Sequence, residues 1–193
     1  MIRADLASGI SGPVWTLVSP SAILQGGNPY FVPDFDSLFE ARMALALRIG
    51  KLGKGIAPRF AHRYVDAVAP AVVFVAANCL ERSVIEGLPW TSAVSYDRSL
   101  ALGRFRAVEF GKIPECPVGM TIESEGDIRQ ESFTLQAAGL PVDETLAALS
   151  VDNTLKTGDI ILAGLPSSGP QVSPGQTLRL SIFGEESLRF NIR

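Results

Sequence analysis

The chain has no excess of basic residues. Its 193 residues include 17 Lys and Arg against 20 Asp and Glu, which gives a formal net charge of −3. No stripe of Lys and Arg runs along the sequence. Proteins that hold the phosphates of a nucleic acid present such a stripe or patch. The sequence therefore predicts no nucleic-acid partner.

Long apolar segments are also missing. The apolar run 67–77 contains Pro70 and stops before Asn78, whereas a membrane-spanning helix needs about 20 apolar residues. The N-terminal segment contains Arg3 and Asp5 and lacks the apolar core of a signal peptide. We therefore expect a cytoplasmic protein with no membrane partner.

Cysteine is scarce, with Cys79 and Cys116 as the only two. The two could form a disulfide, but two free, buried thiols are the preferred interpretation because the chain carries no secretory segment. Cys79 follows an apolar run and has no base beside it. We interpret it as a small core residue rather than a nucleophile.

The other candidates for chemistry have structural interpretations that we prefer. No carboxylate or nucleophile stands in a defined relation to the only histidine, His62, so we expect a surface or hydrogen-bonded residue rather than a general base. The segment 167–169 could bind an anion through its backbone N–H groups, but no helix follows it. A string of acids could bind a cation, yet at a hairpin turn it is typical of a solvated face. These acids are Glu123, Glu125, Asp127 and Glu131.

Apolar residues are abundant, at 47% of the chain, and they are spread along its length. This predicts one globular domain, residues 1–193, with a sizeable core. Strand patterns outnumber helix patterns, so we expect an α+β fold that is mainly β, with one or two helices. The expected strands are 42–50, 71–77, 118–124, 128–135, 159–163 and 177–183, with a weak candidate at 104–110. The expected helices are 58–68 and 141–149, and 78–103 is expected to be mainly loop.

The segment 42–50 shows the strand pattern most clearly. Its larger apolar residues alternate with Arg and Ala. This period of two indicates a strand with one face on the core. The apolar positions are Met43, Leu45, Leu47 and Ile49.

The C-terminal segment 156–193 carries the clearest family pattern. It holds two strand-like runs, each introduced by a glycine turn, and the loop 164–170 between them is rich in Gly, Pro and Ser. This arrangement resembles the C-terminal signature of the fumarylacetoacetate hydrolase superfamily, which includes acylpyruvate hydrolases, 2-keto-4-pentenoate hydratases and 4-oxalocrotonate decarboxylases. The resemblance is clearest over 42–193, with 1–41 as a lead-in, and it implies a mixed β-roll or sandwich.

In that family, three carboxylates hold Mg²⁺ or a similar hard cation, which prefers charged oxygen ligands. Two of them form a Glu-x-Glu pair shortly before an Ile-Gly-Lys turn, and this chain has the turn at 49–51. Alignment on the turn without gaps places Arg42 and Ala44 at the two acidic positions. A register with a two-residue bulge would use Glu40 and Arg42 instead, which keeps one carboxylate at best.

The resemblance implies that the other site positions have changed as well. The family's third acid lies nine residues after a helical Tyr, here Tyr64, so Val73 stands at that position. The family's catalytic Lys precedes a segment that matches 95–103, so Val94 stands at the Lys position. Leu165 stands where the hydrolases carry a Thr that faces the substrate carboxylate.

We therefore interpret the chain as a fumarylacetoacetate hydrolase-like protein without the family's metal-ligand carboxylates and Lys. Buried carboxylates that lose their cation cost several kcal/mol each, so apolar replacements are what a metal-free pocket needs. We expect a non-catalytic homologue with a binding or structural role and no cofactor. The resemblance also implies a homodimer.

Two alternatives remain open. One is an active C–C hydrolase or hydratase on a 2-oxo acid or acylpyruvate-type substrate, with Mg²⁺ or Mn²⁺ held in a rearranged site by Glu40 or Asp97. The other is a non-catalytic partner of a homologous active chain. An apolar pocket beside a basic residue could also hold a small carboxylate. The candidate lining residues are Arg42, Arg48, Asp97, Gly164, Leu165 and Pro166.

Overall fold

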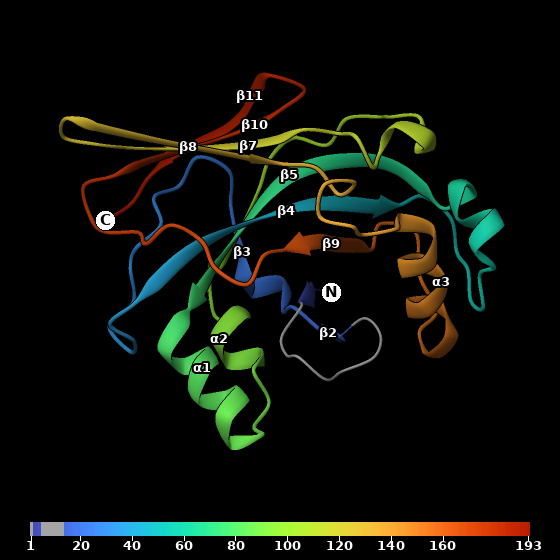
Figure 1. Ribbon diagram of the computed structural model, residues 1–193, viewed down its shortest axis with the longest axis horizontal. Coiled ribbons are helices and arrows are strands. Elements are labelled where there is room, and N and C mark those ends of the chain that lie inside the picture. The colour runs from blue at the N-terminus through green and yellow to red at the C-terminus, as the bar shows by residue number, and fades with distance from the viewer. Residues whose placement is uncertain (1, 5–13) are drawn as a thin grey trace.

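The computed structural model describes residues 2–4 and 14–193, which form two β-sheets and a few helices (Figure 1). The larger sheet has the strand order β2-β1-β9-β4-β5-β6-β3, and the smaller has the order β11-β10-β7-β8. The large sheet consists of β1 (Ile2–Ala4), β2 (Val14–Thr16), β3 (Ile23–Leu24), β4 (Phe39–Ile49), β5 (Val65–Ala76), β6 (Leu100–Leu102) and β9 (Ile160–Leu165). The small sheet consists of β7 (Val118–Ser124), β8 (Asp127–Phe133), β10 (Thr177–Ile182) and β11 (Glu185–Asn191). The predicted fold class, α+β and mainly β, is confirmed.

The two longest strands, β4 and β5, pair antiparallel inside the large sheet. Their ladder runs from Phe39 opposite Ala76 to Ile49 opposite Val65. Both strands are buried over most of their length, on both faces of the sheet. The strand predicted at 42–50 is confirmed, but the expectation of a single buried face is wrong because helices cover the second face.

Two hydrophobic clusters lie on opposite faces of the large sheet. The larger cluster fills the space between the sheets, where Leu45 and Phe74 of the large sheet join Leu178 and Leu180 of the small one. The smaller cluster lies on the other face. There α1 (Ala77–Glu86) and α2 (Thr91–Val94) contribute side chains from below the sheet in Figure 1.

The helix predicted at 58–68 is not present. The structure has a 3-10 helix, η2 (Pro58–Arg63), and β5 already begins at Val65. The apolar spacing of this segment fits a helix locally, but pairing with β4 buries its second half inside a sheet. Tertiary contacts therefore override the local period. The second predicted helix is confirmed as α3 (Val142–Asp152).

The segment 78–103 holds more regular structure than the expected loop, because it contains most of α1, all of α2 and β6. Gly87 ends α1 in the left-handed conformation, with φ of 67°. The weak strand candidate at 104–110 is also wrong. It forms an isolated bridge between Arg106 and Val68 and the start of the 3-10 helix η3 (Phe110–Lys112).

The strand predicted at 71–77 is confirmed as the second half of β5, and the remaining strand predictions are confirmed as β7, β8, β9 and β10. The sequence does not predict β1, β3, β6 or β11. Both cysteines are free thiols, with Cys116 buried and Cys79 half-buried. No helix in the described part of the chain is long and apolar enough to span a membrane.

Candidate functional site

The positions that the family resemblance assigns to metal ligands share one face of the large sheet. Side chains alternate along a strand, and Met43 and Leu45 of β4 belong to the cluster between the sheets. Arg42 and Ala44 therefore lie on the opposite face, which we call the site face. Arg42 is directly opposite Val73 in the β4–β5 ladder. The pairing of two strands thus gathers residues that are far apart in the sequence.

The site face carries apolar side chains at three of these positions. Ala44, Val73 and Val94 belong to one buried cluster, and their exposed fractions are 0%, 0% and 1%. Val94 comes from α2, which packs against β5, and Leu165 joins the same cluster from β9. None of these four side chains offers an oxygen or nitrogen donor.

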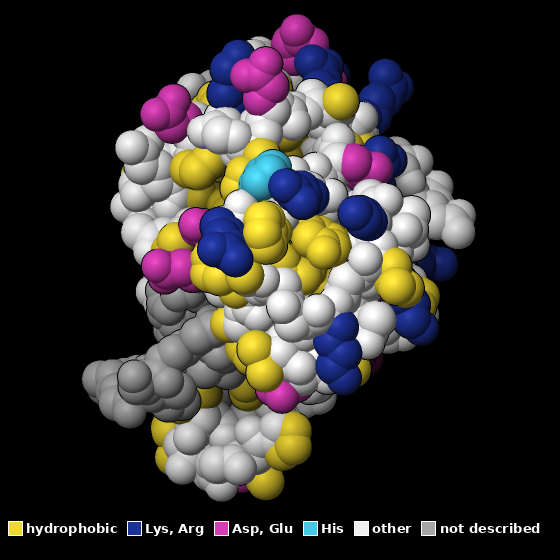
Figure 2. Space-filling model, turned by 90° about the vertical axis from the view of Figure 1, so that its right-hand side faces the viewer, with side chains coloured by type: hydrophobic (Ala, Val, Ile, Leu, Met, Phe, Trp, Pro, Cys, Tyr) yellow, Lys and Arg dark blue, Asp and Glu magenta, His cyan; other side chains and the backbone are white. Residues whose placement is uncertain are grey.

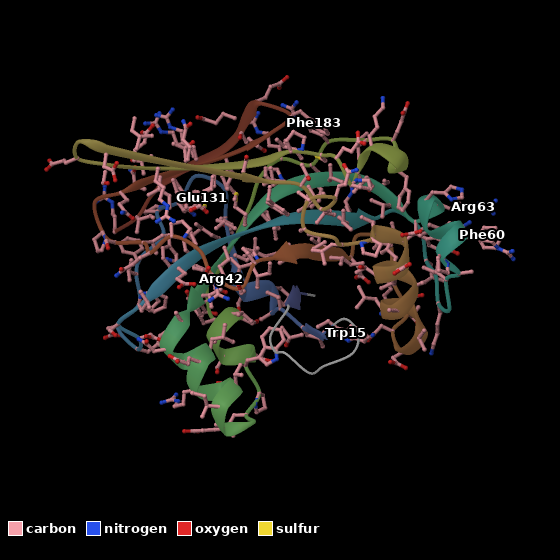
Figure 3. All side chains as sticks on the ribbon, viewed as in Figure 1. Trp15, Arg42, Phe60, Arg63, Glu131 and Phe183 are labelled. Carbon is pink, nitrogen blue, oxygen red and sulfur yellow. The ribbon has the colours of Figure 1, made fainter. Side chains whose placement is uncertain are left out.

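Arg42, also on the site face, is a buried cation with fixed partners. Only 5% of its surface is exposed. Its Nε donates to Oε2 of Glu40 at 2.9 Å, and its Nη2 lies 2.8 Å from the same oxygen. Its Nη1 donates to the backbone carbonyl of Pro166 at 3.4 Å. Figure 3 shows Arg42 where β4 passes above α1 and α2. The guanidinium is therefore neutralised by the acid two residues before it on the same strand face.

The Gly/Pro/Ser loop closes over this ion pair. The Gly169 N–H donates to Oε2 of Glu40 at 3.2 Å, and the Ala41 N–H donates to the Pro170 carbonyl at 2.9 Å. A Cβ at position 169 would overlap the carbonyl oxygen of Ala41, so the close approach requires glycine. The segment 167–169, considered above as an anion-binding site, thus uses the Gly169 N–H to bind a carboxylate of the protein itself, that of Glu40. The bond between Gly169 and Glu40 is not predictable from the sequence. The only local signal is the spacing of two residues between Glu40 and Arg42, which places both side chains on one face of the strand.

The remaining pocket candidates are divided between different places. Arg48 donates to Oδ1 of Asp66 at 2.7 Å in a half-exposed ion pair, and its guanidinium lies 5.4 Å from the ring centre of Phe105. Asp97 is exposed in the turn between α2 and β6. Neither residue contacts the pair of Arg42 and Glu40.

Three candidates, Gly164, Leu165 and Pro166, line a cavity of about 400 Å³ together with Met43 and Phe133. Gly164 adopts a positive φ of 88°, and a Cβ there would lie 2.6 Å from the Phe133 ring. A glycine is therefore needed on both counts. The cavity also borders Glu131 of β8 (labelled in Figure 3), whose carboxylate pairs with Arg129.

A divalent cation does not fit this donor set. Hard cations take several carboxylate or carbonyl oxygens, whereas the described carboxylate beside Arg42 is that of Glu40 alone. Its Oε2 already accepts contacts from Nε and Nη2 of Arg42 and from the Gly169 N–H. Throughout residues 2–4 and 14–193, no group of three or more His, Cys, Asp or Glu is placed to hold a metal. The guanidinium of Arg42 adds repulsion to any cation that approached.

Two titratable groups with shifted pKa values, Tyr30 and Tyr96, lie with the cluster between the sheets, on the other side of the large sheet from the site face. The hydroxyls of Tyr30 and Tyr96 are joined by a hydrogen bond of 2.8 Å, and the Tyr30 ring stacks on Phe74 with centres 3.6 Å apart. Burial raises the pKa of both hydroxyls well above the usual range. Both tyrosines therefore stay protonated and neutral at physiological pH.

His62 lies far from these groups. It is exposed on η2, among basic and apolar side chains on the face drawn in Figure 2. Figure 3 places its neighbours Phe60 and Arg63 at the opposite end of the molecule from Arg42. The histidine is thus a surface residue, as expected, and is not part of the site.

Comparison with known proteins finds a matching family and similar sequences along nearly the whole chain. A sequence model described as "Fumarylacetoacetate (FAA) hydrolase C-terminal" matches residues 9–193. The oxaloacetate tautomerase FAHD1 of Mus musculus mitochondria is 28% identical over 185 residues, which cover 95% of this chain and 82% of the relative. The mitochondrial oxaloacetate decarboxylase of Dictyostelium discoideum is 29% identical over 192 residues, which cover 97% of this chain and 87% of the relative.

Solved structures share the fold. A fumarylacetoacetate hydrolase family protein from Yersinia pestis superimposes with a TM-score of 0.86 at 23% identity, over 100% of this chain and 90% of the other. A fumarylpyruvate hydrolase from Pseudomonas aeruginosa, crystallised with Mn²⁺ and pyruvate, superimposes with a TM-score of 0.78 at 20% identity, over 94% of this chain and 79% of the other.

Proposed function

Because this chain belongs to the fumarylacetoacetate hydrolase C-terminal family, we propose that it is a member of the family without a divalent-metal centre. It does not carry out the family's metal-dependent catalysis and serves as a binding or structural subunit. The observation that carries this proposal is the single buried apolar cluster that contains Ala44, Val73 and Val94.

The proposal follows from the cost of buried charge. Positions 44 and 73 have no exposed surface. A carboxylate there would lose several kcal/mol of hydration unless a cation or a set of donors replaced the water. With aliphatic side chains at both positions, the interior is stable without an ion. The cluster therefore needs no bound ion, whereas carboxylates at the same positions would need one.

The ion pair of Arg42 and Glu40 also supports the absence of a metal centre. The Arg42 guanidinium supplies a permanent positive charge, and Glu40 and the Pro166 carbonyl satisfy it. This internal ion pair leaves no cation requirement, and it ties the loop to β4. The loop that would otherwise border a substrate pocket is held in place by the protein's own charges.

An active enzyme is the second candidate, and it is favoured by the similarity over nearly the whole chain to enzymes named for oxaloacetate. In that case the substrate is a 2-oxo acid, and Glu40 is the acid on the site face that could take part. Asp97 is exposed in another turn, so a metal bound by both would need a rearranged α2–β6 segment.

Metal analysis separates the two candidates. The purified protein is assayed by mass spectrometry for bound metals, and its melting temperature is measured with and without Mg²⁺ and Mn²⁺. A ligand that binds the native state raises the melting temperature. We expect no stoichiometric metal and no shift. The Pseudomonas aeruginosa fumarylpyruvate hydrolase serves as the positive control, because its crystal structure holds Mn²⁺.

An activity assay completes the test. The protein is incubated with oxaloacetate, and tautomerisation and decarboxylation are followed against the mouse relative as a control. We expect rates equal to the uncatalysed reaction. A stoichiometric, stabilising cation, or turnover that is lost in a Glu40→Gln variant, would establish the second candidate instead.

A further inference from the structure

Two cavities adjoin at the outer edge of the small sheet, and neither is lined by Arg42, Ala44, Val73, Val94 or Leu165. Their volumes are about 550 Å³ and 470 Å³, and both are lined by Gly27 and Arg189. The first is also bordered by Phe31 and Arg193, and the second by Arg104. We call the two together the arginine groove.

The strand period of β11 builds one wall of the groove. Phe190 and Ile192 are buried, with exposed fractions of 3% and 1%. Because side chains alternate along an extended chain, Arg189, Asn191 and Arg193 lie on the other, solvent-facing side, where all three are exposed. Two arginines and an amide thus form one row.

The segment before β4 supplies an aromatic ring beside this row. The Tyr30 N–H donates to the Asn191 carbonyl at 2.9 Å, and the Arg193 N–H donates to the Tyr30 carbonyl at 2.8 Å. Tyr30 is 1% exposed, whereas the next residue, Phe31, is 54% exposed. The ring of Phe31 therefore borders the first cavity, and the hydrogen bonds of Tyr30 to Asn191 and Arg193 hold its backbone beside the arginine row.

The turn at Gly103 and Arg104 forms the second wall. The Arg104 N–H donates to Oγ of Ser187 in β11 at 2.7 Å. A Cβ at position 103 would lie 2.7 Å from Cγ of Pro70 and 2.5 Å from the Ser187 hydroxyl. Glycine lets the turn lie close to both, and the hydrogen bond holds Arg104 at the rim of the second cavity.

The side chains that line the groove carry more positive than negative charge, with three arginines and one glutamate. No described carboxylate lies within ion-pair distance of Arg104, Arg189 or Arg193. The first cavity has no acidic side chain in its lining. The second has Glu186, whose carboxylate lies 3.8 Å from Nε of Arg179 on the neighbouring strand. Three unpaired guanidinium groups thus gather in a concave region of a chain whose net charge is −3.

We propose that the arginine groove binds a small organic molecule with two anionic groups, one in each cavity, joined by a body that packs against Phe31. Guanidinium groups bind phosphate and carboxylate through paired hydrogen bonds. A concave, positively charged region also raises the local concentration of an anion. The aromatic ring adds apolar contact for the part of the ligand between the two charges.

The test measures binding of two probes that each carry two anionic groups on an aliphatic body, propane-1,3-bisphosphonate and glutarate, by isothermal titration calorimetry at constant ionic strength. Because each guanidinium makes charge-assisted hydrogen bonds to the ligand, Arg189→Gln and Arg193→Gln are each expected to weaken binding about tenfold or more. Tighter binding of the bisphosphonate would identify a phosphate ligand, and tighter binding of glutarate a carboxylate ligand.

The matched control is Arg59→Gln, which changes an exposed arginine on η2 that stacks on Phe60 and borders neither cavity. We expect it to leave the affinity unchanged. Because the side chains of Arg59, Arg189 and Arg193 are exposed, we expect the three variants to melt at the wild-type temperature. That result would show that they are folded. The proposal is overturned if neither probe binds the wild type saturably, or if Arg59→Gln weakens binding as much as Arg189→Gln.

Discussion

Arg42 and Val73 lie directly opposite each other in the β4–β5 ladder, the first a buried cation and the second an aliphatic side chain with no exposed surface. A metal centre that used both positions as carboxylates would need two negative charges facing each other, balanced by an ion. In this chain the facing pair needs no ion.

The first prediction concerns the buried ion pair. Arg42→Ala leaves the Glu40 carboxylate without its main partner, and removal of one side of a buried pair costs about 3–5 kcal/mol of unfolding free energy. We expect a loss of about 3 kcal/mol, because Glu40 retains its hydrogen bond from the Gly169 N–H and 16% of its side-chain surface is exposed. Urea denaturation measures it.

The control for that measurement is Arg48→Ala on the same strand face. Its pair with Asp66 has side-chain exposures of 41% and 46%, and exposed ion pairs contribute little to stability. The double variant Glu40→Gln with Arg42→Met should recover much of the stability that Arg42→Ala loses. Equal losses for Arg42→Ala and Arg48→Ala would show that burial of the first pair has no energetic consequence.

The second prediction is that a cation site can be restored. The triple variant Arg42→Glu, Ala44→Glu, Val73→Asp places three carboxylates on the site face, where hard cations find oxygen ligands. Mutual repulsion destabilises it without metal, so we expect Mn²⁺ to raise its melting temperature while leaving that of the wild type unchanged.

Folding of the triple variant only in the presence of Mn²⁺ would count as the same result, because metal binding then supplies folding free energy. The matched control is Val73→Asp alone, which offers too few ligands and should be destabilised with or without Mn²⁺. A triple variant that is folded and indifferent to Mn²⁺ would mean that these three positions do not converge on one ion.

The third prediction is a pH effect at the start of α1. Burial raises the pKa of Asp36, but hydrogen bonds from the backbone N–H groups of Cys79 and Leu38, from the Asn78 side chain and from the Ser37 N–H outweigh it, so the pKa is lowered. A carboxyl whose pKa is lower in the native state stabilises the fold above its unfolded pKa of about 3.9, and this contribution is lost as the pH falls through the native pKa.

Urea denaturation of the wild type and Asp36→Ala therefore gives a stability difference that is constant at neutral pH and shrinks in acid. The substitution Asp34→Ala, which changes an exposed acid in the same loop, is the control. If the difference between wild type and Asp36→Ala were as large in acid as at neutral pH, the carboxylate charge would not be what holds the helix start.

The fourth prediction distinguishes the two cysteines. Burial raises the pKa of the Cys116 thiol to about 11, and only 1% of its surface is exposed. Because the thiolate is the reactive form, Ellman's reagent at pH 8 should react with Cys79 and spare Cys116 in the native protein. Both should react in denaturant. Absence of any reactive thiol in denaturant would indicate a disulfide.

The sequence predicts the strands of this fold better than its helices. The period of two in β4 and the aliphatic run in β5 are local patterns, so they are visible without the structure. The helix expected at 58–68 has an equally good local pattern, but it competes with the pairing of β5 and β4, which no local window contains. In α1, Asn78, Glu81 and Arg82 share one polar face of the helix, but the helix buries only Leu80 and Ser83, so its apolar pattern is too short to stand out in the sequence.

For the site, too, the sequence predicts the residues at each position but not their contacts. Alignment with the family pattern selected Ala44, Val73 and Val94 one at a time, and the structure places them in one cluster. Alignment says nothing about backbone partners, so the Pro166 carbonyl and the Gly169 N–H that fix the ion pair were not foreseen. Arg48 and Asp97 were chosen by residue type, and their side chains lie elsewhere because the strand register and the turn after α2 decide their positions.

The β4–β5 ladder also bears on the order in which the chain folds. Its first contact, between Ile49 and Val65, closes a short loop, whereas β9 reaches Leu45 of β4 from far along the sequence. Loop closure becomes entropically harder with length, and distant pairings slow folding. The two strands that carry the site positions can therefore pair early, and the loop that covers Arg42 arrives with β9 as one of the later steps.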